Sequence, residues 1–262
     1  MDNQYRPLVP VNPKGLDDVA EALLNEVPDD DKDKGNKPPA PSTIQNREQY
    51  IILPSKTHGK YSYPDMLVAM DLTHLGKNWY DTHKLLAAEE NRMLTIRQFV
   101  DFVNLLKTGR AFNGAGKPVD KRKLDTIVDN IMTVRDPVRA EWLDAKFETR
   151  GGLVGVGSKM HINYNHTVDA AGNIKLGKIE QLEPYLESDK KPGIHAEQWL
   201  RDANSYGLPK PNITNGNLWY WYPRNGNVAG FGADSTWAYL DCNRNPSNTY
   251  AWLGVRVARE KS

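Results

Sequence analysis

Hydrophobic residues occupy every second position in two segments near the C-terminal end of the chain. These positions are Ala229, Phe231 and Ala233 in the first segment and Ala238, Leu240 and Cys242 in the second. A period of two is typical of a β-strand with one buried face. We therefore predict two strands that bury these residues, and we expect Leu253, Val255 and Val257 to belong to the same scaffold.

Earlier in the chain the hydrophobic period is close to that of a helix. Thr95 and Gln98 have the spacing of a capping box, and Gly109 follows the last turn of the helix that they open. Its apolar stripe is Ile96, Phe99, Val100, Val103 and Leu106. Another helix precedes it within residues 79–109, one follows Asp120, and a short one lies within residues 194–204. Short apolar runs predict strands at 50–54, 66–71 and 142–147, and residues 153–168 join 174–182 through a hairpin-like turn.

This mixture predicts an α+β fold with a mixed or antiparallel sheet, flanking helices and a long irregular C-terminal segment. Residues 49–262 are expected to form this domain. Residues 1–27 form an N-terminal arm with a short amphipathic helix, and residues 28–48 form a charged, Pro-rich linker. The arm either docks onto a partner or larger particle, or folds onto its own domain.

Composition excludes several broad classes. A net charge of +1 argues against a dedicated nucleic-acid or membrane-surface binder. No apolar run approaches the roughly 20 residues that span a bilayer, and the N-terminal residues show no signal-peptide core. The single cysteine, Cys242, permits no internal disulfide.

The C-terminal segment differs from the rest in composition. Residues 218–259 contain four of the seven tryptophans, and residues 211–256 contain no Lys, Glu, Gln or Met. By composition this window should hold about eight residues of those four types. The outward strand positions combine aromatic with short polar residues, as the binding loops of antibodies do. The alternative interpretation is a Gly- and Asn-rich region of loop and edge strand.

The end of this segment carries a resemblance to a known family. Residues 243–248 (Asn-Arg-Asn-Pro-Ser-Asn) and 253–257 (Leu-Gly-Val-Arg-Val) resemble the RNRNNP and GFR ending of C-type-lectin-fold domains of the formylglycine-generating-enzyme type. Within that fold the chain is similar to the variable proteins of diversity-generating retroelements, including those of archaeal viruses. The resemblance implies a C-type lectin fold, a variable region at about 218–256, no enzymatic activity, and display on a virion or a cell surface.

The resemblance also implies which residues contact the ligand. In that family, template Asn codons are randomised at their adenines, so that AAC and AAT never give Lys, Glu, Gln, Met or Trp. The expected contact residues are Trp219, Tyr220, Trp221, Tyr222, Gly230, Gly232, Asp234, Thr236, Trp237, Tyr239, Asp241, Asn243, Asn245, Asn248, Thr249, Tyr250 and Trp252. Trp237 and Trp252 lie outside the set that such codons permit. The expected partner is a variable ligand, most simply a protein on a host or target surface.

The residues argue against three other functions. No HExxH or CxxC motif is present, and a strand would place His161 and His166 on opposite faces, so we expect no metal and no other cofactor. A formylglycine-generating oxidase needs a pair of cysteines, and this chain has one. A calcium-dependent sugar-binding lectin needs an EPN or QPD triplet with WND, and these are missing.

Overall fold

The computed structural model describes residues 46–151, 157–187, 193–213 and 216–261. All of them belong to Pro41–Ser262, the second of the two units into which the chain divides. The expected N-terminal arm, residues 28–45 of the expected linker, and residues 153–156 of a predicted strand lie outside the described residues. Residues 47–48, which the sequence assigned to the linker, belong to the 3₁₀ helix η2 (Arg47–Gln49).

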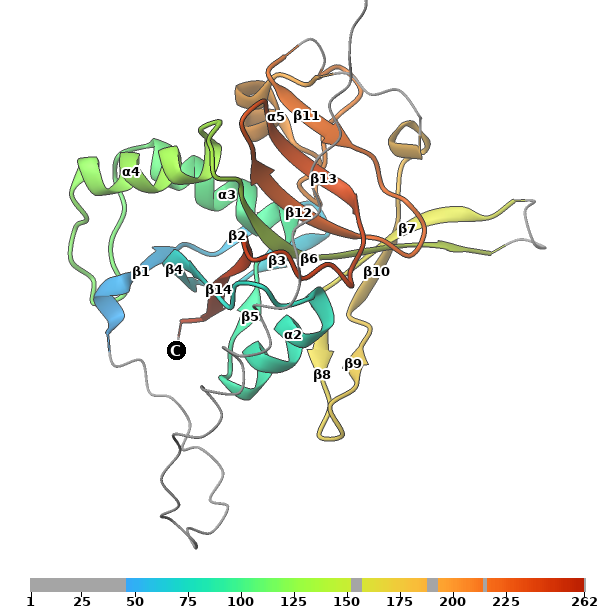
Figure 1. The fold of residues 1–262 in the computed structure, drawn as a ribbon, viewed down its shortest axis with the longest axis horizontal. Helices are drawn as coiled ribbons and strands as arrows, with labels where there is room; N and C mark the ends of the chain where they lie inside the picture. Colours follow the sequence, from blue (N-terminus) through green and yellow to red (C-terminus); the bar gives the residue numbers. More distant parts are fainter. Residues whose placement is uncertain (1–45, 152–156, 188–192, 214–215, 262) are drawn as a thin grey trace, which may run out of the picture. The chain divides into compact units, whose positions relative to one another are not determined.

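The fold is α+β, as predicted, and is built on a large mixed sheet (Figure 1). The strands of its main path are, in spatial order, β1 (Tyr50–Leu53), β4 (Met66–Thr73), β14 (Leu253–Glu260), β6 (Arg139–Arg150), β12 (Val228–Ala233), β13 (Ala238–Arg244) and β11 (Leu218–Trp221). Neighbours on this path are antiparallel except for two parallel pairs, β14 with β6 and β11 with β13. Strand β5 (Arg92–Met93) joins β14, and β7 (Lys159–Tyr164) joins β6 and β10 (Lys178–Gln181).

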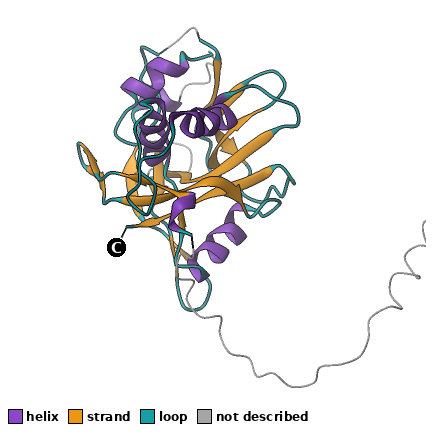
Figure 2. Ribbon diagram, turned by 90° about the vertical axis from the view of Figure 1, so that its left-hand side faces the viewer, coloured by secondary structure: helices purple, strands orange, loops and turns teal. Residues whose placement is uncertain are grey.

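Helices lie on both sides of the sheet (Figure 2). They are α2 (Trp79–Ala88), α3 (Ile96–Lys107), α4 (Lys121–Met132), α5 (Ala196–Asp202) and the 3₁₀ helix η3 (Pro184–Glu187). Alternation along β6 gives each side its own core: Leu143 packs in the cluster that contains the residues of α3, whereas Trp142 packs with Trp79 of α2. The residues of β6 therefore divide between an α3 face and an α2 face of the sheet.

The local sequence signals for the helices are confirmed. The hydroxyl of Thr95 and the side chain of Gln98 form the reciprocal capping box of α3. Asp120 caps α4 by accepting a hydrogen bond from the amide of Arg122 at 2.9 Å. The predicted hairpin is also present, with β8 (Thr167–Val168) paired with β9 (Ile174–Lys175) at its tip and β7 paired with β10 at its base.

A buried ion pair joins three central strands. Glu141 of β6 accepts hydrogen bonds from Arg139 at 2.7 Å and from Arg256 of β14 at 3.2 Å. Arg256 also donates to the carbonyl oxygen of Ala69 in β4, at 3.0 Å. Because a buried charge is tolerated only when it is paired and hydrogen-bonded, these contacts fix the lateral order β4, β14, β6.

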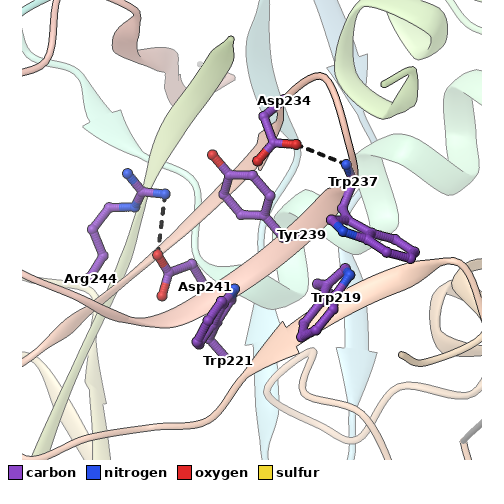
Figure 3. Close-up of a pocket in the computed structure, with 7 residues that line it drawn as sticks. All are labelled: Trp219, Trp221, Asp234, Trp237, Tyr239, Asp241 and Arg244. Atoms are coloured by element: carbon purple, nitrogen blue, oxygen red, sulfur yellow. Dashed lines mark hydrogen bonds and ion pairs between the residues drawn. The ribbon is translucent and has the colours of Figure 1, made fainter. Parts of the chain in front are cut away.

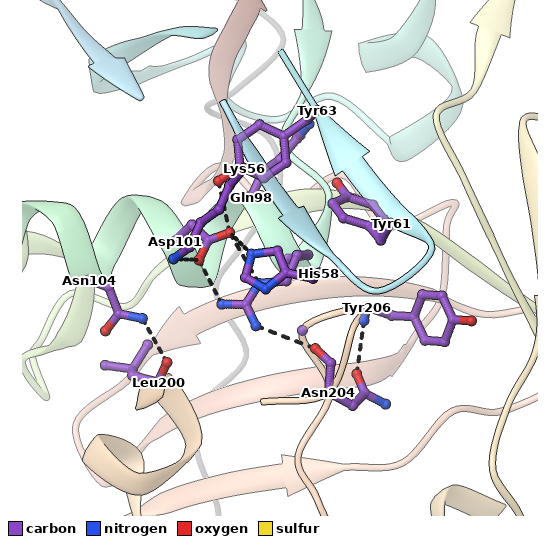
Figure 4. Close-up of polar contacts among 12 residues, drawn as sticks. Lys56, His58, Tyr61, Tyr63, Gln98, Asp101, Asn104, Leu200, Asn204 and Tyr206 are labelled. Atoms are coloured by element: carbon purple, nitrogen blue, oxygen red, sulfur yellow. Dashed lines mark hydrogen bonds and ion pairs between the residues drawn. The ribbon is translucent and has the colours of Figure 1, made fainter. Parts of the chain in front are cut away.

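The hairpin formed by β2 (Lys56–His58) and β3 (Tyr61–Tyr63) was not predicted from the sequence. A second buried carboxylate, Asp101 of α3, holds it (Figure 4). Asp101 accepts hydrogen bonds from Lys56 at 3.0 Å and Tyr63 at 2.8 Å, and its carboxylate lies 2.7 Å from the ring nitrogen of His58. Arg97, one helical turn earlier, contacts both of its oxygens. We call these five residues the Asp101 network.

Candidate ligand-binding site

Strand β13 has the two faces that its alternation predicts. Ala238, Leu240 and Cys242 are buried, and the scaffold residues Phe231, Leu253, Val255 and Val257 are buried as well. Tyr239 and Asp241 face the other way and are half-buried. Because β11 runs parallel to β13, Trp219 lies beside Tyr239 and Trp221 beside Asp241. The outward face thus presents a row of aromatic and acidic side chains.

These side chains surround a cavity of about 400 Å³, which we call the aromatic pocket (Figure 3). Its lining residues are Trp219, Trp221, Asp234, Trp237, Tyr239, Asp241 and Arg244. The rings of Trp219 and Trp237 meet edge to face at 5.3 Å, and those of Trp219 and Trp221 lie 5.9 Å apart. Trp237 remains 40% exposed. A pocket of this kind offers apolar ring surface together with a few charged groups, as ligand sites commonly do.

The turn between β12 and β13 positions Trp237 at the rim of the pocket. One carboxylate oxygen of Asp234 accepts hydrogen bonds from the amides of Thr236 and Trp237, at 2.7 and 2.8 Å. The amide of Asp234 in turn donates to the carbonyl oxygen of Trp237 at 2.9 Å. Such an Asx-type turn orders the backbone of Trp237, so the position of its indole does not depend on burial of the ring.

Arg244 is a site residue that sequence alternation missed. Its register partner is Val228, whereas the previous aligned pair is Asp241 with Gly230, so β13 has one extra residue in this interval. A β-bulge of this kind changes which way the following side chain points. Arg244 consequently lies on the outward face, 3.2 Å from Asp241 and about 5.8 Å from the ring centres of Tyr239 and Trp252.

Burial raises the pKa of two ionisable groups in the aromatic pocket. Removal from water raises the pKa of Asp241, and Arg244 offsets this shift only in part. Burial likewise raises the pKa of Tyr239. A carboxylate whose pKa is raised by burial is incompletely stabilised by its own protein. Asp241 would therefore gain from a cationic or hydrogen-bond-donating group on a ligand.

Four predicted contact residues are not on the open surface. Gly230 and Gly232 are buried because the side chains of Arg244 and Tyr239 lie over them. A Cβ atom on Gly232 would come within 2.7 Å of the Tyr239 ring, and one on Gly230 within 3.1 Å of Arg244. Tyr220 and Tyr222 are also buried, because alternation along β11 directs Tyr220 to the opposite side of the sheet from Trp219, and Tyr222 packs against Tyr220.

The remaining predicted contact residues do not line the pocket. Thr236, Asn243, Asn245 and Thr249 are exposed, and Asn248 is half-buried. Tyr250 is 48% exposed and stacks on Trp252 at 4.7 Å. Arg244 lies near both Tyr239 and Trp252, so it connects the aromatic pocket with this second aromatic pair.

Two groups bear on cofactor chemistry. Cys242 is fully buried, and burial raises the pKa of its thiol well above the usual range, which disfavours the reactive thiolate. On the α2 face of the sheet, His83, Asp144 and His166 bring one potential metal ligand each to a single buried point. The sequence did not indicate this cluster, because its members come from three separate elements. His161 is placed elsewhere, with its Nδ1 2.9 Å from the carbonyl oxygen of Lys159.

Comparison of the chain with protein-family models, with curated proteins and with solved structures returned no match. Within the part of the chain that the structure describes, no helix has the length and apolar character needed to cross a membrane.

Proposed function

We propose that this protein is a non-enzymatic ligand-binding module of C-type lectin fold, whose variable surface is diversified by a retroelement and binds a protein ligand. The observation that carries the proposal is the aromatic pocket. It is open on one face of a segment whose other face is a continuous apolar scaffold. Side chains on the open face can change without altering the core beneath them, which is the physical requirement for a surface that varies.

The chemistry of the pocket favours a protein ligand with a basic or donor-rich side chain. Indole and phenol rings supply rigid contact area at low entropic cost. Ring faces also attract cations, most strongly those of Trp. Asp234 and Asp241 contribute two carboxylates against the single guanidinium of Arg244. A Lys or Arg side chain of the ligand, inserted between the indoles, would pair with the Asp241 carboxylate, whose burial Arg244 offsets only in part.

The fold is compatible with the proposed family. Two helices, α2 and α3, precede most strands of a mixed sheet, and these are the usual early elements of that fold. The segment that carries the resemblance, residues 253–257, lies in the central strand β14, where Arg256 makes the buried ion pair with Glu141. The burial of Cys242 supports a function without thiol chemistry.

Genomic sequence tests the diversification. We expect a near-copy of codons 218–256 beside a reverse-transcriptase gene, with differences at adenines concentrated in exposed codons such as those of Thr236, Asn243, Thr249 and Tyr250. The codons of the buried Gly232 and of the scaffold should be unchanged. A copy whose differences fall on scaffold codons as often as on exposed ones would contradict the proposal.

Selection from a displayed random peptide library tests the binding. We expect peptides enriched on the wild-type protein to contain Lys or Arg, and to bind at least about thirtyfold more weakly to Trp219→Ala and Trp237→Ala, since an interface anchor commonly contributes about 2 kcal/mol or more. Phe112→Ala, which removes a 54% exposed ring outside the pocket, is the control. Equal binding to all four proteins would place the ligand site elsewhere.

A further inference from the structure

The cluster of His83, Asp144 and His166 lies where three elements meet. His83 belongs to α2, Asp144 to β6, and His166 to the turn between β7 and β8. Asp144 Oδ1 lies 2.5 Å from His166 Nδ1 and 3.6 Å from His83 Nε2. The side chains of all three are at most 3% exposed. Their positions are therefore set by the packing of the sheet against α2 and not by solvent.

Two nitrogen atoms of this cluster have no hydrogen-bond partner among the described residues. They are His83 Nε2 and His166 Nε2, and both are buried. A buried polar atom without a partner costs free energy, and native structures rarely leave one unless an ion or water satisfies it. The imidazoles are also fixed in place, because Trp79 meets their rings at 4.1 and 5.0 Å and is itself hydrogen-bonded to the carbonyl oxygen of Leu143.

The ligand types are those of a zinc site, and the ligand atoms lie close enough together to approach one ion. Zinc is bound by imidazole nitrogen and carboxylate oxygen at about 2.0–2.2 Å, so two ligand atoms of a tetrahedral site lie roughly 3.3 Å apart. The two distances from Asp144 Oδ1 fall on either side of this value, and the three ligand atoms lie within 4.8 Å of one another. An ion bound here would replace the 2.5 Å hydrogen bond between His166 Nδ1 and Asp144 Oδ1.

A cavity of about 340 Å³ adjoins the cluster on one side. It is lined by His83 and His166 together with Asn91, Arg92 and the residues 165–168. Three protein ligands with an adjoining cavity leave a fourth coordination position for water or an exogenous group. An ion at this point would also tie α2 to the sheet and to the β8–β9 hairpin.

We propose that this protein binds one Zn²⁺ ion through His83 Nε2, a carboxylate oxygen of Asp144 and an imidazole nitrogen of His166. The site is independent of the proposed function, since it involves none of the residues of the aromatic pocket. Its members are separated by 61 and 22 residues along the chain, which is why no motif marks it.

The test uses the full chain with any affinity tag removed, stripped of metal and then loaded with Zn²⁺ or Co²⁺. We expect one equivalent of zinc per chain by elemental analysis, visible absorption typical of tetrahedral Co²⁺ with nitrogen and oxygen ligands, and a rise in Tm of about 5–10 °C at a hundredfold excess of zinc over its dissociation constant. Absence of both bound metal and the cobalt spectrum would overturn the proposal.

Two variants separate metal binding from folding. Asp144→Asn keeps an oxygen that accepts the hydrogen bond of His166, and His83→Gln removes an imidazole whose Nε2 has no hydrogen bond. His83→Gln should keep a metal-free Tm near that of the wild type, whereas Asp144→Asn should lower it, because Asp144 is a buried carboxylate that accepts two hydrogen bonds from His166. Both variants should lose the cobalt spectrum and the zinc-dependent rise in Tm. His161→Gln, the matched control, should bind like the wild type. Binding that persists in both variants, or that is lost in the control, would show that the ion lies elsewhere.

Discussion

The Asp101 network and the aromatic pocket each surround an aspartate with an arginine and aromatic rings, yet the pKa values of the two aspartates shift in opposite directions. Burial raises the pKa of both carboxyls, but in the network Arg97, Tyr63, Lys56 and His58 outweigh it, so the pKa of Asp101 is lowered. In the pocket Arg244 does not outweigh burial, and the pKa of Asp241 is raised. Groups within the protein fully offset the burial of the Asp101 carboxylate, whereas they offset the burial of the Asp241 carboxylate only in part.

This difference distinguishes the structural use of charge in the Asp101 network from the binding use that we propose for the aromatic pocket. The Asp101 network joins the β2–β3 hairpin to α3, and every contact is internal. The pocket instead leaves Trp237 40% exposed and holds its charges beside half-buried rings. A group that a ligand is to contact must remain incompletely satisfied until the ligand arrives.

The largest expected effect comes from matched substitutions of the two aspartates. Asp101→Asn should lower the free energy of unfolding by about 3 kcal/mol at pH 7, because it breaks a buried, multiply bonded ion pair. Asp241→Asn should change it by less than about 1 kcal/mol, because this carboxylate is less stabilised in the fold. Urea unfolding of both variants measures the contrast. Equal losses would show that the two regions do not differ as the pKa directions indicate.

Acid should weaken the protein partly through the same residue. The folded pKa of Asp101 is lowered, so its contribution to stability is present above the unfolded value of about 4 and is lost as the pH falls through the folded value. We expect the unfolding free energy of the wild type to fall more steeply below about pH 4 than that of Asp101→Asn. Parallel pH profiles of the two proteins would contradict this assignment.

The sequence predicts structural features that depend on residues close together in the chain better than features that depend on distant residues. The capping box at Thr95 and Gln98 and the alternation along β13 involve residues a few positions apart, and both are confirmed. Arg244 was missed because a bulge reverses the alternation, and bulges leave no periodic signal. The β2–β3 hairpin is short, and it is held by the burial of Tyr61 and Tyr63 in the core and by hydrogen bonds to Asp101, which is distant in sequence.

The predicted outward direction of the C-terminal segment holds for its large side chains but does not make its glycines exposed. Large side chains at outward positions, such as Trp219 and Tyr239, do line the pocket. Glycines at outward positions do not remain open, because a neighbouring ring or guanidinium covers a residue that has no side chain of its own. Alternation predicts direction along a strand, but exposure depends also on the size of the neighbours.

The next effect in size concerns Gly232, which lies against the ring of the pocket residue Tyr239. Gly232→Ala would place a Cβ atom 2.7 Å from the Tyr239 ring and 2.8 Å from Ala140, too close for either to remain in place. We expect a loss of about 1–3 kcal/mol in unfolding free energy, typical of overpacking. Ser235→Ala, in the exposed turn that follows, is the control and should be neutral. A stable Gly232→Ala protein would return this position to the variable set.

The smallest expected effect on stability is at the exposed rings, and it is the test that most directly separates the two regions. Trp237→Ala and Tyr250→Ala should each lower the free energy of unfolding by about 1 kcal/mol or less, because each residue is partly exposed and loses mainly its contact with one neighbouring ring. Peptides selected on the wild type should nevertheless bind Trp237→Ala at least about thirtyfold more weakly. Tyr250→Ala should affect only ligands large enough to reach beyond Arg244 to the second aromatic pair. If either substitution unfolds the protein, its ring belongs to the scaffold, and that position is not free to vary.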